Sequence, residues 1–116
     1  MTLPRQIPEH LQAAGIPLEP DAASEMGWCR EDACNVILSL SGTKVAVVAC
    51  DVYVAESWGL VSTNDNLSLE HLVSETATEF AERSRRTALA YIDAHEETTR
   101  ADTFYALSFS RQQDAA

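Results

Sequence analysis

The fold is decided by residues 44–54, which read Lys-Val-Ala-Val-Val-Ala-Cys-Asp-Val-Tyr-Val and contain the longest apolar run of the chain. β-Branched and aromatic side chains favour strands, and a nearly continuous apolar run indicates a strand that is buried on both faces. The next residues, Glu56-Ser57-Trp58-Gly59, are typical of a turn, and residues 60–63 predict a returning strand. This part of the sequence therefore predicts a β-hairpin.

Helices are predicted on both sides of the hairpin. Apolar side chains recur at helical spacing over residues 4–14 and 30–40, and again from Ser74 or Thr76 to about His95. The last of these segments predicts one long helix that packs an apolar strip against the rest of the fold.

Three arginines are predicted on the solvent side of the long helix. Arg83, Arg85 and Arg86 follow Glu79 and Glu82 at spacings of three or four residues, where opposite charges on a helix pair.

The remaining segments complete an α+β fold. Prolines make residues 16–28 irregular, Asn64-Asp65-Asn66 breaks the returning strand before a connector, and alternation over residues 102–110 predicts a final strand at an edge of the sheet. The sequence thus predicts a small single domain over residues 1–116, in the order α-α-β-β-α-β. Its sheet is antiparallel or mixed, has three or four strands and is covered by helices, including the long one near residues 75–96. Residues 112–116 are expected to be a frayed tail.

Composition excludes several classes of partner. Acidic residues number 18 against 8 basic ones, which gives a net charge of −10. Nucleic acids and anionic membranes bind through clustered Lys and Arg, so neither is an expected partner. The sequence starts without the pattern of a signal peptide, and three cysteines (Cys29, Cys34 and Cys50) are an odd number. We therefore expect a cytoplasmic protein with free thiols, either a monomer or a homodimer.

The negative charge is unevenly distributed. Between Val45 and Glu82 there are seven acidic residues and no Lys or Arg. Such a segment either forms a solvated surface that keeps the protein soluble or creates an electrostatic field that steers a basic partner toward it.

The sequence favours no catalytic or cofactor chemistry. Cys29 and Cys34 are too far apart for the Cys-x-x-Cys half of a zinc site, and no Gly-rich phosphate loop is present. The best enzymatic candidate is a carboxylate pair, Asp51 and Asp65, whose two groups would act as acid and base if they lay together. We expect no metal, no cofactor and no enzymatic activity.

Several segments, in the same order along the chain, resemble the immunity protein 40 family of bacterial polymorphic-toxin systems. Family members have an apolar strand that ends in Gly-Gly-Asp-Val-Tyr, a Tyr-Asp-Asn-Trp segment after a hairpin, and a long helix with an Arg-Ser step. Here Ala49-Cys50 replaces the Gly-Gly, and Asn64 and Leu67 replace the two aromatic residues. The corresponding segments are Val47–Tyr53, Asn64-Asp65-Asn66, Glu79–Ser84, Ala90-Tyr91-Ile92, Leu3-Pro4-Arg5 with Gly15-Ile16, and Arg30–Ala33.

The resemblance implies a non-catalytic protein that binds and neutralises a cognate toxin. An acidic inhibitor would suit a toxin with a basic surface. The predicted toxin-binding face is the hairpin, its turn and the connector, with His71 as a further candidate; its residues are Asp51, Tyr53, Glu56, Trp58, Asp65, Asn66 and Glu70.

Each of these residues also has a purely structural interpretation. Trp58 would fold back onto the sheet, Tyr53 would pack in the core, and Asp65 and Asn66 would stabilise a turn. Trp28 is the alternative aromatic anchor, near Glu19, Asp21 and Glu25. The alternative functions are a small-molecule-binding or regulatory α+β domain and, third, a small hydrolase or transferase.

Overall fold

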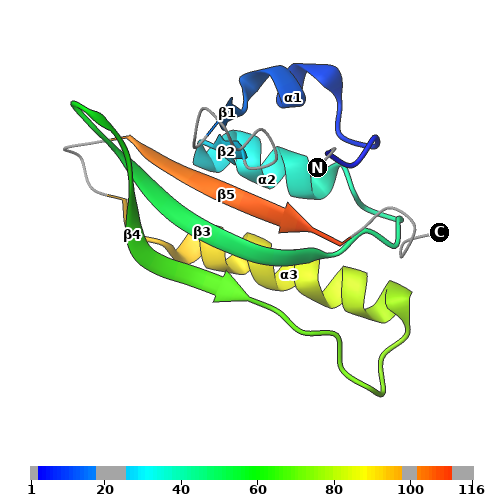
Figure 1. Cartoon of the computed structure of the whole chain (residues 1–116). Helices are drawn as coiled ribbons and strands as arrows, with labels where there is room; N and C mark the ends of the chain where they lie inside the picture. The colour runs from blue at the N-terminus through cyan, green and yellow to red at the C-terminus, as the bar shows by residue number, and fades with distance from the viewer. Residues whose placement is uncertain (1–2, 18–25, 98–101, 111–116) are drawn as a thin grey trace.

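The predicted hairpin is present and is longer than expected. Strand β3 (Val47–Glu56) and strand β4 (Gly59–Ser68) are antiparallel and are joined at Ser57-Trp58 (Figure 1). The structure is a computed structural model that describes residues 3–17, 26–97 and 102–110. The predicted tail at residues 112–116 and the acidic residues Glu19, Asp21 and Glu25 lie outside the described residues.

Five antiparallel strands form one sheet, in the order β1-β2-β5-β3-β4. Strand β5 (Thr103–Phe109) pairs with β3 on one side and with β2 (Met26–Trp28) on the other. The prediction that the last strand lies at an edge was therefore wrong. The expected count of three or four strands was low because β1 (Ile16–Pro17) and β2 are too short to show an alternating pattern.

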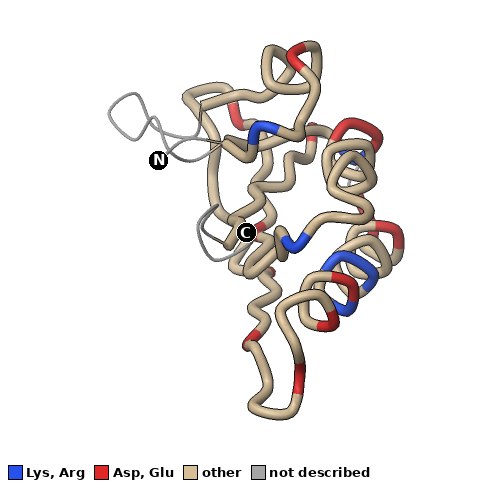
Figure 2. The backbone as a smooth tube through the Cα atoms, turned by 90° about the vertical axis from the view of Figure 1, so that its right-hand side faces the viewer, with Lys and Arg blue, Asp and Glu red and all other residues tan. Residues whose placement is uncertain are grey.

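Two helices cover one face of this sheet. Helix α2 (Arg30–Leu38) and helix α3 (Ala77–Ala94) lie side by side on it, and α1 (Glu9–Ala14) packs against α2 (Figures 1 and 2). The predicted α+β class is confirmed. The largest fully buried side chains, which fill the space between helices and sheet, are Trp28, Tyr105, Ile7, Ile37, Leu40, Ile92, Val36, Val45, Val47 and Val52.

Helix α3 has the ends that its sequence predicts. The Thr76 side chain accepts a hydrogen bond from the backbone N–H of Glu79, and the Glu79 carboxylate accepts one from the N–H of Thr76. This reciprocal capping box satisfies two donors that a helix start otherwise leaves unpaired. The backbone N–H of His95 closes the other end on the Ile92 carbonyl.

Arg85 does not face solvent as predicted. Only 7% of it is exposed, and its Nη1 donates to the carbonyl oxygens of Thr43 at 3.0 Å and Val45 at 2.8 Å. Next to it, the buried Ser84 hydroxyl accepts a hydrogen bond from the N–H of Val47 at 3.0 Å. Helical spacing alone gave the wrong partners because these groups come from a distant segment of the chain.

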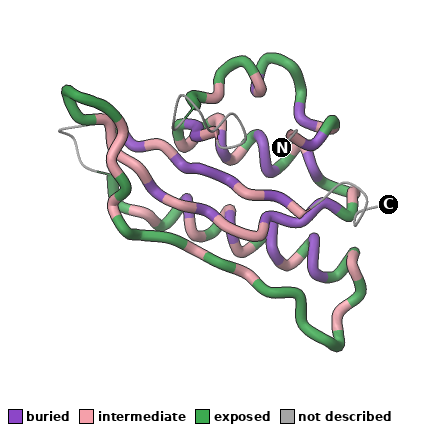
Figure 3. Tube along the Cα trace, viewed as in Figure 1, coloured by how far each residue is buried: buried purple, intermediate pink, exposed green. Residues whose placement is uncertain are grey.

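Three smaller expectations were also wrong. Helix α1 starts at Glu9, not at residue 4, because Pro8 disfavours helical geometry at the residue before it. Strand β4 continues through Asn64-Asp65-Asn66 to Ser68, so this segment interrupts the strand without ending it. Strand β3 is not buried on both faces: the face turned away from the helices is only partly buried, since none of the described helices covers it (Figure 3).

In the described part of the chain, no helix combines the length and the apolar character needed to cross a membrane.

We expect Arg85→Met to lower the free energy of unfolding by about 2–4 kcal/mol, because two buried carbonyl groups lose a charged donor. Arg86→Met is the matched control, since Arg86 is the neighbouring residue on α3 and is exposed. It should change the free energy by less than about 0.5 kcal/mol. Urea denaturation of the three proteins measures both values, and equal values for the two variants would contradict the anchoring role.

Candidate functional site

The register of the sheet places Asp51 and Tyr53 on the face that the helices leave open. Cys50 pairs with Leu107 and Val52 with Tyr105, and all four belong to the core on the helix side. Successive strand residues point to opposite faces. The two intervening residues of β3 therefore point away from α2 and α3, each opposite a β5 residue: Asp51 opposite Ala106 and Tyr53 opposite Phe104.

Strand β4 adds polar groups to the same face. Asn66 lies opposite Asp51, and Ser62 lies opposite Tyr53. Directly opposed residues share one face of a sheet, so the carboxylate, the amide, the phenol ring and the Phe104 ring lie near one another. We call Asp51, Tyr53, Ser62, Asn66 and Phe104 the open face. It combines acceptors for basic groups with partly exposed aromatic rings.

A bulge interrupts β4 next to this group. Between Ser62 and Asn66 the strand has two residues more than β3 has opposite them. Asn64 takes a left-handed backbone with φ 68°, and the Thr63 hydroxyl donates to the carbonyl of Val52 at 2.9 Å. Asparagine tolerates this backbone conformation better than most residues.

Asp65 lies at the end of α3 instead. It lines a shallow hollow of about 410 Å³ together with Tyr91, Ala94, His95 and Glu96. Burial, followed by the charges of Cys50, Asp65 and Asp51, raises the pKa of the Tyr91 hydroxyl. Because the hollow is on the helix side, Asp65 and Asp51 lie on opposite faces, and the hypothesised acid–base pair is not assembled.

The hairpin tip carries the most exposed aromatic side chain among the described residues. Trp58 is 77% exposed, so the interpretation in which it folds back onto the sheet was wrong. Glu56 is exposed beside it, opposite Gly59. The alternative anchor, Trp28, is fully buried and donates from Nε1 to the carbonyl of Leu11 at 2.7 Å.

Glu70 and His71 lie far from the hairpin tip. They belong to the connector, residues 69–76, which joins β4 to α3. The two ends of β4 are about 30 Å apart at the usual rise per residue. In Figure 1 the tip and the connector are at opposite ends of the molecule. The structure therefore divides the predicted binding face into the open face, the tip and the connector, and it leaves Asp65 apart at the end of α3.

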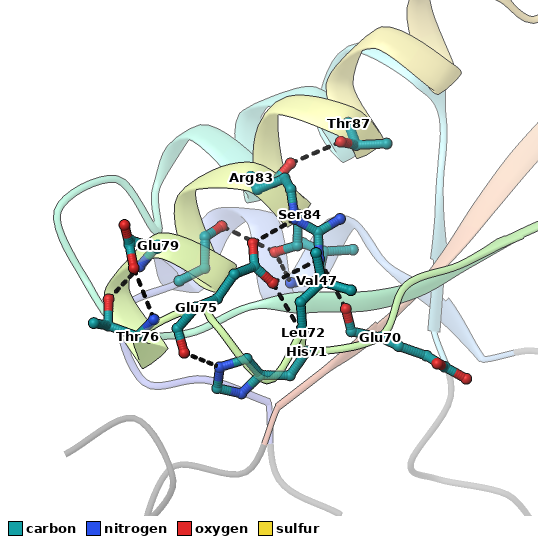
Figure 4. A network of polar contacts seen from close by, with 11 residues as sticks. Val47, Glu70, His71, Leu72, Glu75, Thr76, Glu79, Arg83, Ser84 and Thr87 are labelled. Atoms are coloured by element: carbon teal, nitrogen blue, oxygen red, sulfur yellow. Dashed lines mark hydrogen bonds and ion pairs between the residues drawn. The ribbon is translucent and has the colours of Figure 1, made fainter.

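A polar network holds the connector to α3. The Arg83 guanidinium donates to both carboxylate oxygens of Glu75, at 2.6 and 2.9 Å, and to the carbonyl of Glu70 at 2.8 Å (Figure 4). Glu75 also accepts from the N–H of Leu72 at 2.9 Å. Helical spacing predicts that Arg83 pairs with a residue of its own helix, but its partner is Glu75, which precedes α3.

His71 completes this network. Its Nε2 lies 2.7 Å from the carbonyl oxygen of Glu75, and its ring stacks on Phe80 with the ring centroids 5.0 Å apart. Beyond these contacts, Leu72 is 52% exposed and Val73 is fully exposed. The connector is thus a fixed loop in which two apolar side chains, Leu72 and Val73, face solvent.

The acidic residues of the segment from Val45 to Glu82 do not form one patch. They follow β3, β4, the connector and the start of α3, and Glu75 is neutralised by Arg83 (Figure 2). Among the residues the structure describes, no three His, Cys, Asp or Glu side chains are grouped as a metal ion requires. Burial raises the pKa of the Cys50 thiol to about 12, which makes it a poor nucleophile.

Comparison with known proteins gives one match. The family model described as Immunity protein 40 matches residues 10–109. No curated protein and no solved structure matches the chain.

The Glu75–Arg83 pair makes stability depend on pH. Its hydrogen bonds lower the pKa of Glu75 from 4.5 to about 2. A depressed carboxyl pKa stabilises the fold fully above its unfolded value, and this stabilisation is lost as the pH falls toward the folded value. Glu75→Gln should therefore lower the Tm at pH 7, and the difference from the unmodified protein should shrink below about pH 4.5 and vanish near pH 2.

Thermal melts of both proteins across this range measure the effect. A Tm difference that stays constant from pH 7 to pH 2 would contradict the pairing. Glu79→Gln should not reproduce this profile, because the Glu79 carboxylate caps the backbone N–H of Thr76 and, among the residues that the structure describes, accepts from no basic side chain.

Proposed function

The chain belongs to the immunity protein 40 family, and from this membership we propose that it binds a cognate toxin of a polymorphic-toxin system and neutralises it. The observation that carries the proposal is the family match over residues 10–109. This range includes the whole hairpin, α2, α3 and β5. The protein protects the cell that makes the toxin, so we place it in the cytoplasm, as a monomer or homodimer.

The proposed binding surface is the open face and the adjoining hairpin tip. Asp51 and Asn66 accept hydrogen bonds from basic side chains, and Tyr53 and Phe104 offer ring surface beside them. Trp58 projects from the tip, where its burial by a partner would remove a large apolar area from water. Glu70 borders this surface from the connector, whereas Asp65 lies outside it, at the end of α3.

The toxin is proposed to have a basic surface. A net charge of −10 and the base-free segment create a field that accelerates the approach of a positively charged partner. Inhibition by occlusion needs no chemistry from this chain, so the proposed role is non-catalytic. The separation of Asp51 from Asp65 supports that role, because a carboxylate pair was the best enzymatic candidate.

Co-expression tests the function directly. Cells that produce the toxin domain encoded by the neighbouring gene should survive when this chain is produced with it and die when it is absent. Because the proposed role involves no turnover, any loss of protection with Asp51→Asn should match its loss of toxin binding. Continued killing at equal levels of both proteins would overturn the proposal.

Trp58→Ala tests the surface. We expect it to weaken binding of the purified, inactive toxin domain by about 2–4 kcal/mol, as truncation of an aromatic hot spot does. Leu38→Ala, which truncates an exposed leucine of α2, is the control and should leave the affinity unchanged. Calorimetry gives both values, and an unchanged affinity for Trp58→Ala would exclude the tip.

Charge reversal tests whether the acidic residues of this surface steer the toxin toward it. Glu56→Lys/Glu70→Lys should reduce both the association rate and its dependence on salt. The control, Glu31→Lys/Asp93→Lys, changes the net charge equally on exposed positions of α2 and α3. If both double variants slow association equally, net charge and not this surface governs the encounter.

A further inference from the structure

We infer that the connector between β4 and α3 is a preformed apolar prong that enters a pocket on the toxin, with Leu72 and Val73 as its two contact residues. The inference rests on the proposed function. It adds a contact region at the far end of β4 from the hairpin tip, and it specifies what that part of the toxin offers: an apolar pocket with a basic rim.

The first argument is the exposure of the two side chains. Leu72 is 52% exposed and Val73 is fully exposed, and they are adjacent in sequence. Neither belongs to a core cluster. Solitary exposed leucines are common in folded proteins, but two adjacent aliphatic side chains at the tip of a projecting loop are a small apolar patch that a partner can bury.

The loop that carries Leu72 and Val73 is held in place by side-chain contacts. Arg83 joins Glu75 to the carbonyl of Glu70, and Glu75 in turn accepts from the N–H of Leu72. His71 is held by the Glu75 carbonyl and the Phe80 ring. Figure 4 shows this network on the inner side of the loop, between the connector and α3. A loop ordered before binding loses little conformational entropy when it docks, so its apolar contacts contribute more fully to affinity.

The surroundings of the prong are negatively charged. Arg83 is neutralised by Glu75, and the Glu70 carboxylate points away from the network toward solvent (Figure 4). Glu79 lies in the first turn of α3, next to the loop, and Lys44 lines a hollow together with His71 and Phe80. The surroundings are therefore negative on balance, which suits basic side chains at the rim of an apolar pocket.

The chain provides a closely matched control for the experiment. Leu38, the last residue of α2, is 53% exposed, which is nearly the same as Leu72. Leu72→Ser, Val73→Ser and Leu38→Ser are compared for binding to the purified, inactive toxin domain of the neighbouring gene, by calorimetry at fixed salt. Circular dichroism confirms that all three are folded, as expected for exposed positions.

We expect Leu72→Ser and Val73→Ser each to weaken binding about tenfold or more and Leu38→Ser to have no effect. Glu75→Gln keeps both apolar side chains but loosens the loop, and it should weaken binding by about three- to tenfold at a temperature where it remains folded. Normal binding by Leu72→Ser and Val73→Ser overturns the inference while leaving the proposed function intact. If the unmodified chain does not bind the toxin, both are overturned.

Discussion

The hydrogen bonds that join Ser84 and Arg85 to the segment that enters β3 fix the position of α3, and the rest of the architecture depends on them. The N–H of Val47 and the carbonyls of Thr43 and Val45 have their partners in these side chains. An apolar strip alone would allow the helix to slide along the sheet, whereas buried polar groups must be paired and so allow one register. With α3 fixed in this way, the helices occupy one face of the sheet and the other face stays open.

This arrangement determines how candidate contact residues are distributed. The molecule is elongated, with a longest dimension of 44 Å, and β4 runs along much of it. The hairpin tip, the open face and the connector follow one another along this direction. An interface of standard size, roughly 800 Å² on each partner, is about 30 Å across. One toxin can therefore contact all three groups if it lies along β4, and a smaller contact must select one end.

Sequence patterns predicted the parts of the fold that local chemistry controls. The hairpin and the long helix with its Thr76 cap depend on neighbouring residues, and both were confirmed. The errors concern partners far apart in sequence. Nothing near Arg85 reveals that it donates to residue 43, and two- or three-residue strands such as β1 and β2 have no periodicity to detect.

The candidate site was predictable as a set of residues but not as a surface. The hairpin and connector were identified from residue types and from family resemblance, and exposure of Trp58 is confirmed. Which side chains share a face depends on strand register, and the bulge in β4 changes the pairing: Asn66 lies opposite Asp51, while Asp65, one residue earlier, lies on the α3 side. The bulge adds two residues to β4 between Ser62 and Asn66, so the residue opposite Asp51 cannot be counted from the turn and requires a structure.

The bulge also affects how readily the exposed edge of the sheet can pair with a strand of another chain. Strand β4 is one edge of the sheet, ten residues long and without Lys or Pro, which makes it a potential template for the strands of other chains. The left-handed Asn64 interrupts the line of outward backbone groups halfway along, so an incoming strand finds only short regular stretches on either side. The irregularity thus discourages open-ended, amyloid-like stacking on this edge while leaving it accessible to a partner shaped to fit.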